Sequence, residues 1–351
     1  MQENPITVQI ILDNLQPALT LGFLGFALSM ILTPVYTKFA FHYKWWKKPR
    51  VDTVTGEKAT VFTKMHAEKH KRHIPTMAGM ISLIALSTVT LLFNFDRGQT
   101  WLPLAAALGA GFVGLLDDII NLGKAGESGT AGLNFRLKLL LTGFIATGLS
   151  YWFVYKLEYT SVNVPFGGVL QLAAPLALLG FIFVIVATAN AVNITDGLDG
   201  LAAGLLVTAF AAFAVIAFLQ GNFGIAGFCL TLVGVLLSFL WFNIFPARFF
   251  MGDVGSFAFG TSLAVVAIML NSVLLIPVIG LMFVVEVGSA GVQLLSKKIF
   301  KRKIFISAPI HHHFEAIGWP ETKVTMRFWV LGQVCGVLGL LVAVLGGHLT
   351  L

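Results

Sequence analysis

Long apolar stretches separated by short polar clusters make up most of this chain. An α-helix that crosses a bilayer needs about 20 apolar residues. Stretches of that kind predict ten helices, which cover roughly residues 17–43, 75–93, 100–119, 134–154, 172–192, 199–219, 223–244, 255–271, 273–296 and 324–347. Because the apolar residues run continuously and do not alternate, the pattern favours helices over the strands of a barrel.

The connections between these helices carry fewer signals. Residues 157–171 alternate in polarity and contain Gly167-Gly168, which predicts a small outer β-hairpin that serves as a lid or spacer. Only Asn271-Ser272 separates the eighth predicted helix from the ninth. No cleavable signal peptide is expected, because the first apolar run is long enough to span a membrane. We expect residues 1–351 to form a single integral-membrane domain.

The charge balance supports a membrane protein and orients it. Hydrophobic residues make up 57% of the chain and charged residues 11%, whereas a soluble protein carries about 25% charged residues. Lysine and arginine concentrate in residues 44–73 and 297–323, and cytoplasmic loops collect such residues. Both segments are then cytoplasmic, both termini lie on the outer face, and only Arg97 and Lys156 of 23 basic residues fall outside.

The net charge of +7 is therefore mainly a signal of topology, and we expect no nucleic-acid partner. Basic loops beside a bilayer can also attract anionic lipid or an anionic substrate, and the sequence leaves both open. Cys229 and Cys335 lie within predicted helices and are expected to pack there, without a disulfide or a metal site.

Four polar clusters lie among the apolar stretches, and the topology places all of them at the cytoplasmic ends of helices. They are Asp117-Asp118, Asn190 to Asp199, Phe250 to Ser256 and Ala308 to Glu315. Carboxylates at a bilayer boundary are costly to keep there, so their default interpretation is functional. Several of them at one depth predict a site that holds a cation and phosphates, as in an enzyme.

The acidic residues divide into three groups. Asp117 and Asp118 are adjacent on a helix and diverge by about 100°, so they have different roles; alternatively, one pairs with Lys124 or Lys138 at the helix end. Asp196 and Asp199 are three residues apart, as neighbours on one helical turn are, and Asn190 and Asn193 repeat that spacing. The alternative for this segment is that Asn193 or Thr195 caps the next helix.

Asp253 lies between Gly252 and Gly255, where the eighth predicted helix begins. A helix N-terminus favours anions, so a carboxylate there repels a phosphate unless a cation lies between them. Mg²⁺ commonly bridges carboxylates and phosphate oxygens in this way. The alternative is an ordinary helix cap.

His311, His312 and His313 are consecutive, so on a helix they point about 100° apart and do not suit one metal ion. Hydrogen bonds to phosphate or sugar oxygens fit better, with Glu315 as an orienting partner. Glu286 and Gln293 lie seven residues apart on one face of the ninth predicted helix. An interhelical hydrogen bond is the plainer interpretation of that pair.

Several segments together match a known family. They are Pro75 to Gly79, Asp117-Asp118, Asn190 to Ala202, Phe239 to Asn243, Phe250 to Ser256 and Ala308 to Glu315, followed by Gly318 to Pro320. Over about residues 17–348, the chain resembles the phospho-N-acetylmuramoyl-pentapeptide transferase family, of the polyprenyl-phosphate N-acetylhexosamine-1-phosphate transferase superfamily. The segment with three histidines separates this branch from relatives that use other sugars.

The resemblance implies a defined reaction. Phospho-MurNAc-pentapeptide passes from UDP-MurNAc-pentapeptide to undecaprenyl phosphate with Mg²⁺, which gives lipid I and UMP in peptidoglycan synthesis. Such phosphoryl transfer depends on positioning and on charge stabilisation. The family also implies a multi-pass protein of the bacterial cytoplasmic (inner) membrane, with its active site facing the cytoplasm, and a homodimer.

The resemblance also implies roles for single residues. Asp253 is the Mg²⁺ ligand, Asp117 positions or deprotonates the lipid phosphate, and Asp118 and Asp196 support the site. Asp117, Asp118 and Asp196 are also further candidate ligands of the metal. The substrate-binding residues are Lys138 near the phosphates, Asn190 and Asn193, the uridine pocket of Gly197, Leu198, Asp199, Asn243 and Phe250, and His311, His312 and His313 on the phosphate or sugar side of the donor.

Two departures from the family pattern stand out. Asn121 occupies a position where the family usually has lysine, so Lys124 substitutes for it or one phosphate contact is lost. The usual Gly-Thr-Pro-Thr-Met-Gly-Gly is His73 to Gly79 here, which leaves the uridine-side cation open between Lys71 and Arg72. No carboxylate is lost, so activity is expected at altered affinity.

Two other functions remain as alternatives. A sister enzyme that uses another UDP-N-acetylhexosamine would carry the same aspartates, but the segment with three histidines argues against it. A transporter would also hold acids within the membrane. Transporters place their sites near the midplane on broken helices, whereas Asp117, Asp196 and Asp253 lie at predicted helix ends.

Overall fold

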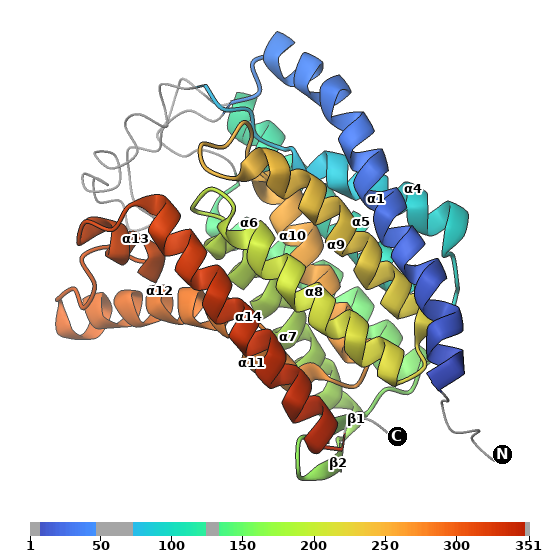
Figure 1. Ribbon diagram of the computed structural model, residues 1–351. Helices are drawn as coiled ribbons and strands as arrows, with labels where there is room; N and C mark the ends of the chain where they lie inside the picture. Colours follow the sequence, from blue (N-terminus) through green and yellow to red (C-terminus); the bar gives the residue numbers. More distant parts are fainter. Residues whose placement is uncertain (1–7, 47–72, 124–132, 348–351) are drawn as a thin grey trace.

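The chain folds into a bundle of long apolar helices (Figure 1). The computed structural model describes residues 8–46, 73–123 and 133–347. The long helices are α1 (Val8–His42), α4 (Gly79–Phe93), α5 (Trp101–Gly123), α6 (Phe135–Tyr151), α7 (Ala174–Thr195), α8 (Leu201–Leu219), α9 (Phe223–Asn243), α10 (Gly252–Met269), α12 (Leu281–Phe300) and α14 (Glu321–Leu345). Short elements are η1 (Trp152–Lys156), η2 (Val273–Leu275), α11 (Ile276–Ile279), α13 (Ile310–Ala316), β1 (Ser161–Val164) and β2 (Gly168–Gln171).

The all-helical membrane fold expected from the apolar pattern is confirmed. Within the described residues, eight helices are long and apolar enough to cross a membrane, and a bent pair makes up to nine. The second predicted helix, residues 75–93, corresponds to α4, which has only 15 residues and spans about 22 Å, less than a typical hydrocarbon core. It is short because residues 73–78 form an irregular segment that pairs with Trp45 and Phe250 instead of starting the helix.

The ninth predicted helix is broken. Residues Val273–Ile279 and Leu281–Phe300 meet at an angle of 82°. Pro277 and Gly280 lie at the junction, and both residue types interrupt helices. As a result, α12 turns away from the bundle and runs beneath α13 in Figure 1.

Helix α10 occupies the centre of the bundle. It is buried along nearly its whole length and packs against α5, α7, α4 and α8. Small residues allow this close packing: a Cβ on Gly260 would lie 2.9 Å from the Cα of Ala189 on α7. The first turn of α10 is therefore held rigidly against its neighbours, and this turn carries Asp253.

The predicted hairpin is confirmed. Strands β1 and β2 pair antiparallel, with Ser161 opposite Gln171 and Val164 opposite Gly168. The hairpin lies at the end of the bundle where α1 begins and α14 ends, opposite α13 (Figure 1). Its role as a lid or spacer and the outward position of both termini remain predictions.

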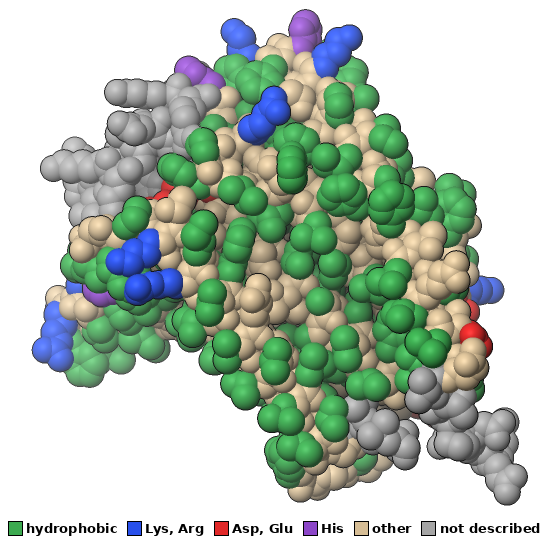
Figure 2. Space-filling view, viewed as in Figure 1, with side chains coloured by type: hydrophobic (Ala, Val, Ile, Leu, Met, Phe, Trp, Pro, Cys, Tyr) green, Lys and Arg blue, Asp and Glu red, His purple; other side chains and the backbone are tan. Residues whose placement is uncertain are grey.

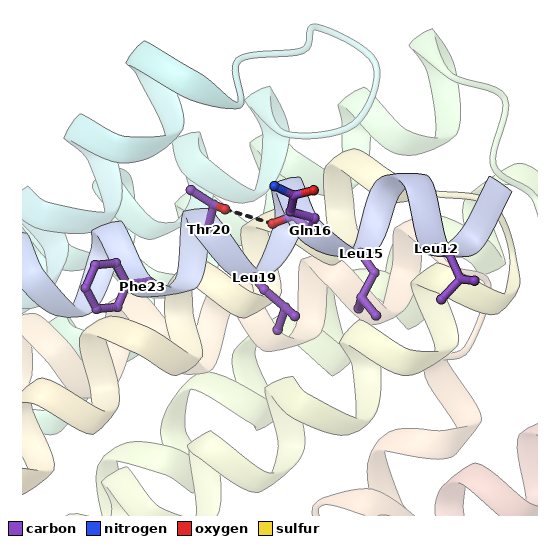
Figure 3. Close-up of a pocket in the computed structure, with 6 residues that line it drawn as sticks. All are labelled: Leu12, Leu15, Gln16, Leu19, Thr20 and Phe23. Carbon is purple, nitrogen blue, oxygen red and sulfur yellow. Dashed lines mark hydrogen bonds between the residues drawn. The ribbon is translucent and has the colours of Figure 1, made fainter. Parts of the chain in front are cut away.

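Hydrophobic side chains cover most of the visible lateral surface, and lysine and arginine gather toward one end and beside α13 (Figure 2). A depression also runs along the first turns of α1 (Figure 3). It is lined by Leu12, Leu15, Gln16, Leu19, Thr20 and Phe23, and its only internal hydrogen bond drawn joins the hydroxyl of Thr20 to the carbonyl of Gln16 at 2.8 Å. Because it offers no titratable side chain, catalytic chemistry has to be sought elsewhere.

Candidate active site

Three aspartates meet where α5 ends and α10 begins. One carboxylate oxygen from each of Asp117, Asp118 and Asp253 lies within 4.8 Å of the others. Asp117 and Asp118 are buried, and Asp253 is half-buried. Asp196 does not belong to this group. The structure thus brings together three of the four acids that the sequence offered as metal ligands.

Lys138 joins two of these carboxylates. Its ammonium nitrogen lies 2.9 Å from Oδ2 of Asp117 and also forms an ion pair with Asp253. The backbone N–H of Leu133 donates to the other oxygen of Asp117 at 2.6 Å. The alternative that one carboxylate pairs with Lys138 is therefore correct for Asp117. Because the same cation also binds Asp253 from another helix, it is part of a cluster of opposite charges and not a simple pair at a helix end.

Local sequence explains how Lys138 reaches the acids. Asn134 precedes α6, and its side-chain oxygen accepts a hydrogen bond from the backbone N–H of Leu137 at 2.8 Å. This cap starts the helix close to Asp117. Lys138 then lies in the first turn of α6, with 13% of its side chain exposed, and its amine extends toward α5 and α10.

Two glycines allow α5 and α10 to approach closely at the acids. A Cβ on Gly114 would overlap the backbone of Asp253. Gly252 has a φ of +77°, and a Cβ there would lie 2.5 Å from Oδ2 of Asp118. That oxygen accepts the backbone N–H of Val254 at 3.1 Å. Asp118 therefore accepts one of the backbone N–H groups that have no partner within α10 at its start. The alternative interpretation of Asp253 as an ordinary helix cap is wrong, because Asp253 lies inside the helix.

The turn between α7 and α8 holds the next group of predicted residues. Helix α7 ends at Thr195, and Asp196 to Gly200 form a turn, so Asp196 and Asp199 are not neighbours on a helical turn as expected. Gly197 and Gly200, the latter at φ +77°, explain why no helix continues here. Both acids therefore lie in a turn outside any helix.

Asp199 and Asn243 fasten this turn to the rest of the protein. Oδ2 of Asp199 accepts the N–H of Ala247 at 3.0 Å, and its own N–H donates to Oε1 of Glu321 at 2.6 Å. The side-chain oxygen of Asn243 accepts the N–H of Gly200 at 2.9 Å. These two predicted pocket residues thus hold α7, α9 and α14 in register around the turn.

The two asparagines of α7 behave differently from each other. Asn190 donates to the carbonyl of Val186 at 2.8 Å, a bond within its own helix. Asn193 donates to the hydroxyl of Ser256 at 2.9 Å, one turn after Asp253 on α10. Neither Asn193 nor Thr195 caps α8, because the residue at that N-cap is Gly200. The capping alternative for this segment is wrong.

The last two members of the predicted uridine pocket serve the frame of the site in the structure. Leu198 is buried in the main hydrophobic core. The N–H of Phe250 donates to the carbonyl of Pro75 at 2.8 Å, and the carbonyl of Phe250 accepts the N–H of Ala78 at 3.0 Å. Phe250 thereby joins the irregular segment before α4 to the loop before α10.

The three histidines lie on and around α13 and have different partners. Nδ1 of His311 lies 2.7 Å from Oε2 of Glu286, and Nδ1 of His312 lies 2.8 Å from Oε2 of Glu315. Nδ1 of His313 accepts the backbone N–H of Ile306 at 3.3 Å. Glu315 orients His312, as expected, whereas the absence of a shared metal ion remains a prediction.

The side chain of His311 connects α13 to the turn after α7. The ring of His311 packs against the Cα of Gly197, since a Cβ there would overlap the imidazole.

The pKa of His312 is lowered to about 4, because burial disfavours its charged form and His311 adds repulsion. His312 is therefore neutral at physiological pH and can accept as well as donate a hydrogen bond.

Asn121 lies on α5, one turn beyond the two aspartates. It is buried, and within the described residues neither atom of its side-chain amide has a hydrogen-bond partner. Lys71, Arg72 and Lys124 lie outside the described residues, so the expectation that one of them contacts the substrate remains a prediction.

Comparison with known proteins identifies the family. Residues 100–271 match the family model described as Glycosyl transferase family 4. A phospho-N-acetylmuramoyl-pentapeptide-transferase of Geobacillus sp. is 37% identical over 336 residues, which cover 92% of this chain and 96% of the relative. A protein of the same name from Chloroflexus aurantiacus is 36% identical, and the match covers 96% of this chain and 92% of the relative. Another from Desulforudis audaxviator is 37% identical, and the match covers 92% of this chain and 97% of the relative.

This chain belongs to the phospho-N-acetylmuramoyl-pentapeptide-transferase family. The similarity extends over nearly the whole chain, so it includes the acidic cluster on α5 and α10 as well as the histidines of α13. The recognition made from the sequence segments is confirmed. The alternative of a transporter loses its basis, because the relatives are named transferases.

The acidic cluster in this transferase suits a hard divalent cation. Mg²⁺ prefers oxygen ligands and is usually bound by one or two carboxylates plus waters and substrate phosphates. Asp117, Asp118 and Asp253 supply three carboxylates at compatible spacing, and a cation, the ammonium of Lys138, already lies between two of them. The residues present therefore fit the metal that the family implies.

Sequence reasoning missed several contacts that hold the transferase site together. The interhelical hydrogen bond expected of Glu286 is present, but its partner, His311 of α13, could not be predicted; Gln293 instead binds the backbone of Ile304 and Phe305. Ser256 and Glu321 were not singled out at all. Glu286 gave the one available signal, since a carboxylate inside an apolar helix needs a partner.

Proposed function

We propose that this protein transfers phospho-MurNAc-pentapeptide from UDP-MurNAc-pentapeptide to undecaprenyl phosphate, releasing UMP and forming lipid I. It is a multi-pass membrane enzyme of peptidoglycan synthesis. The observation that carries the proposal is the cluster of Asp117, Asp118, Asp253 and Lys138 at the ends of apolar helices, in a chain with transferase relatives along nearly its whole length. A lipid phosphate and a nucleotide can meet only at such a boundary.

The charges of the cluster suggest how the residues divide the work. Asp253 and Asp117 share Lys138, so the ammonium reduces the repulsion between their carboxylates and a phosphate group. Asp118 is held by the N–H of Val254 and fixes the start of α10. We assign Asp253 as the principal metal ligand and Asp117 as the residue that positions or deprotonates the lipid phosphate, with Asp118 and Asp196 in support.

Bound Mg²⁺ would supply charge neutralisation for the pyrophosphate and the departing UMP. The protein provides the rest by positioning. Burial of Asp117 and Asp118 limits access of water, and a rigid frame of helices holds reacting groups in place. We place the uridine at the frame formed by Gly197, Leu198, Asp199, Asn243 and Phe250. We assign the phosphate or sugar side of the donor to His311, His312 and His313, and further substrate contacts to Asn190 and Asn193.

We place the enzyme in the bacterial cytoplasmic membrane with this site facing the cytoplasm. Support comes from the concentration of lysine and arginine in residues 297–323 and 44–73, since cytoplasmic loops collect such residues. We also propose a homodimer, as the family resemblance implies.

The release of UMP by purified protein in detergent tests the reaction. The assay contains Mg²⁺, undecaprenyl phosphate and either UDP-MurNAc-pentapeptide or UDP-GlcNAc. We expect release only when both lipid and UDP-MurNAc-pentapeptide are present. Release with UDP-GlcNAc instead would assign the protein to the sister branch, and no release with either donor would show that the departures at Asn121 and His73 to Gly79 have abolished the chemistry.

A further inference from the structure

Two exposed cations share one aromatic ring at the start of α14. The ammonium of Lys323 lies 4.6 Å and the guanidinium carbon of Arg327 4.5 Å from the centre of the Trp319 ring. Cations are attracted to the face of an indole ring at such distances. Trp319 is itself fixed, because it stacks on Phe314 of the α13 helix with ring centres 4.8 Å apart. The ring therefore holds two like charges together at a defined place.

Nothing in the described part of the chain neutralises this pair. Within those residues, neither Lys323 nor Arg327 has a carboxylate partner. The nearest acids in the sequence are engaged elsewhere: Glu321 accepts the N–H of Asp199, and Glu315 binds His312. Both cations lie within 4.6 Å of one ring centre and repel each other, so the arrangement favours an anionic ligand that both can contact.

An exposed apolar stripe continues from the cations along α14. It consists of Val330, Val334, Val337 and Leu341, all more than half exposed. At 100° per residue, these side chains and the two cations fall within about 80° of one another on the helix surface. From Arg327 to Leu341 the helix rises about 21 Å, which exceeds one leaflet's half of a hydrocarbon core of about 30 Å.

The combination of two cations and an apolar stripe is complementary to one class of ligand, an anionic amphiphile. A paired positive charge stands at the end of a helix long and apolar enough to cross the membrane, above an apolar stripe one leaflet long. Figure 2 shows lysine and arginine side chains gathered beside α13 above a largely hydrophobic surface. We propose that Lys323, Arg327 and Trp319 bind the phosphate of an anionic phospholipid, whose acyl chain lies along the stripe of α14.

This lipid site is separate from the residues assigned to catalysis. It adjoins them in two ways: Trp319 packs on Phe314, next to His313, and Thr325 and Trp329 of α14 donate hydrogen bonds to the carbonyls of Asp199 and Gly200. A bound phospholipid would therefore hold α13 against α14 without contacting the reacting groups. Stabilisation of the folded enzyme by anionic lipid is the expected consequence, since a ligand that binds only the native state raises its stability.

Native mass spectrometry of the delipidated protein tests the proposal, with phosphatidylglycerol and phosphatidylcholine as probes. The wild type should retain phosphatidylglycerol preferentially. The double variant Lys323→Gln/Arg327→Gln should lose about tenfold or more of that binding. The matched control is Lys298→Gln/Lys303→Gln, which removes the same charge from exposed positions on the neighbouring basic segment, and it should retain binding within about twofold of wild type.

Further measurements separate this site from its alternatives. Unchanged UMP release and an unchanged thermal midpoint without lipid would show that the double variant is folded, whereas its stabilisation by phosphatidylglycerol should disappear. Equal loss of lipid in both double variants would overturn the proposal in favour of a diffuse charge effect. Displacement of phosphatidylglycerol by inorganic phosphate, or a raised KM for undecaprenyl phosphate with phosphatidylglycerol binding intact, would also overturn it.

Discussion

A buried carboxylate on the bent helix holds one of the three histidines. Glu286 is fully buried on α12, and its Oε2 atom lies 2.7 Å from Nδ1 of His311. The other side of the His311 ring packs against Gly197 in the turn between α7 and α8. Glu286 is thus a positioning residue: it sets the orientation and the tautomer of a histidine that we place beside the donor.

Substitution of Glu286 should impair the use of the donor substrate more than the stability of the fold. We expect Glu286→Leu to lower kcat/KM for the donor by about 10–100-fold, since removing one partner of a buried hydrogen bond costs about 1–3 kcal/mol. Glu286→Gln retains an acceptor for the ring and should recover part of the loss. The KM for undecaprenyl phosphate should stay unchanged in both. Equal losses toward both substrates, parallel to a fall in thermal midpoint, would instead indicate a purely structural role.

His312 makes the stability of the protein depend on pH. Its pKa is lowered to about 4 from an ordinary value near 6.5, first because it is buried and second because His311 is close. Between these values the unfolded chain binds a proton that the folded protein does not. The stabilisation is therefore complete above about pH 6.5 and is lost progressively as the pH falls toward 4.

We expect the thermal midpoint in detergent to decrease as the pH is lowered from 7.5 to 5, and to decrease less in His312→Gln than in the wild type. The comparison of the two slopes removes the contributions of other titrating groups. Identical slopes would show that the folded protein binds this proton as readily as the unfolded chain.

At the scale of helices and strands, the apolar pattern predicted most of the fold but not its irregularities. Nine of the predicted helices correspond to α1, α5 to α10, α14 and the bent pair, because apolar length alone specifies a membrane helix. The late start of α4 depends on backbone pairing of residues 73–78 with Trp45 and Phe250, which no local pattern reveals. The break before α12 had a readable signal in Pro277 and Gly280.

The candidate site was predictable to a similar degree. Topology alone placed the acids at one end, and the structure confirms that Asp117, Asp118 and Asp253 meet there. The conformation of the segment from Asp196 to Gly200 was predicted wrongly, because two glycines overrode the helical spacing. The contacts of Glu286 and Glu321 join segments far apart in the chain, so only the folded structure brings them out.

The close approach of α5 and α10 gives a test at the same scale. A Cβ on Gly114 would overlap the backbone of Asp253, so Gly114→Ala should force the helices apart. We expect a loss of about 1–3 kcal/mol in stability and reduced UMP release, because Asp253 would move. The matched control is Gly148→Ala on α6, where a Cβ would meet nothing within 4 Å and the thermal midpoint should hold or rise. Equal effects of both substitutions would contradict the packing argument.

For the molecule as a whole, the helices act as a frame that brings charge to one boundary of the membrane. Helices α5, α6 and α10 supply the aspartates and the lysine, while α12, α13 and α14 surround the turn after α7. The hairpin and the apolar depression on α1 lie at the other end (Figures 1 and 3). The acidic cluster and the hairpin thus lie toward opposite ends of the bundle.

The dependence of UMP release on Mg²⁺ concentration tests the assignment of the acidic cluster most directly. We would compare the wild type with Asp253→Asn and with Asp196→Asn, whose carboxylate lies outside the cluster. Asp253→Asn should lose about a hundredfold or more in rate at every Mg²⁺ concentration, whereas Asp196→Asn should keep the half-saturating Mg²⁺ concentration of the wild type. A wild-type rate and Mg²⁺ dependence in Asp253→Asn would show that the cluster of α5 and α10 is not the catalytic metal site.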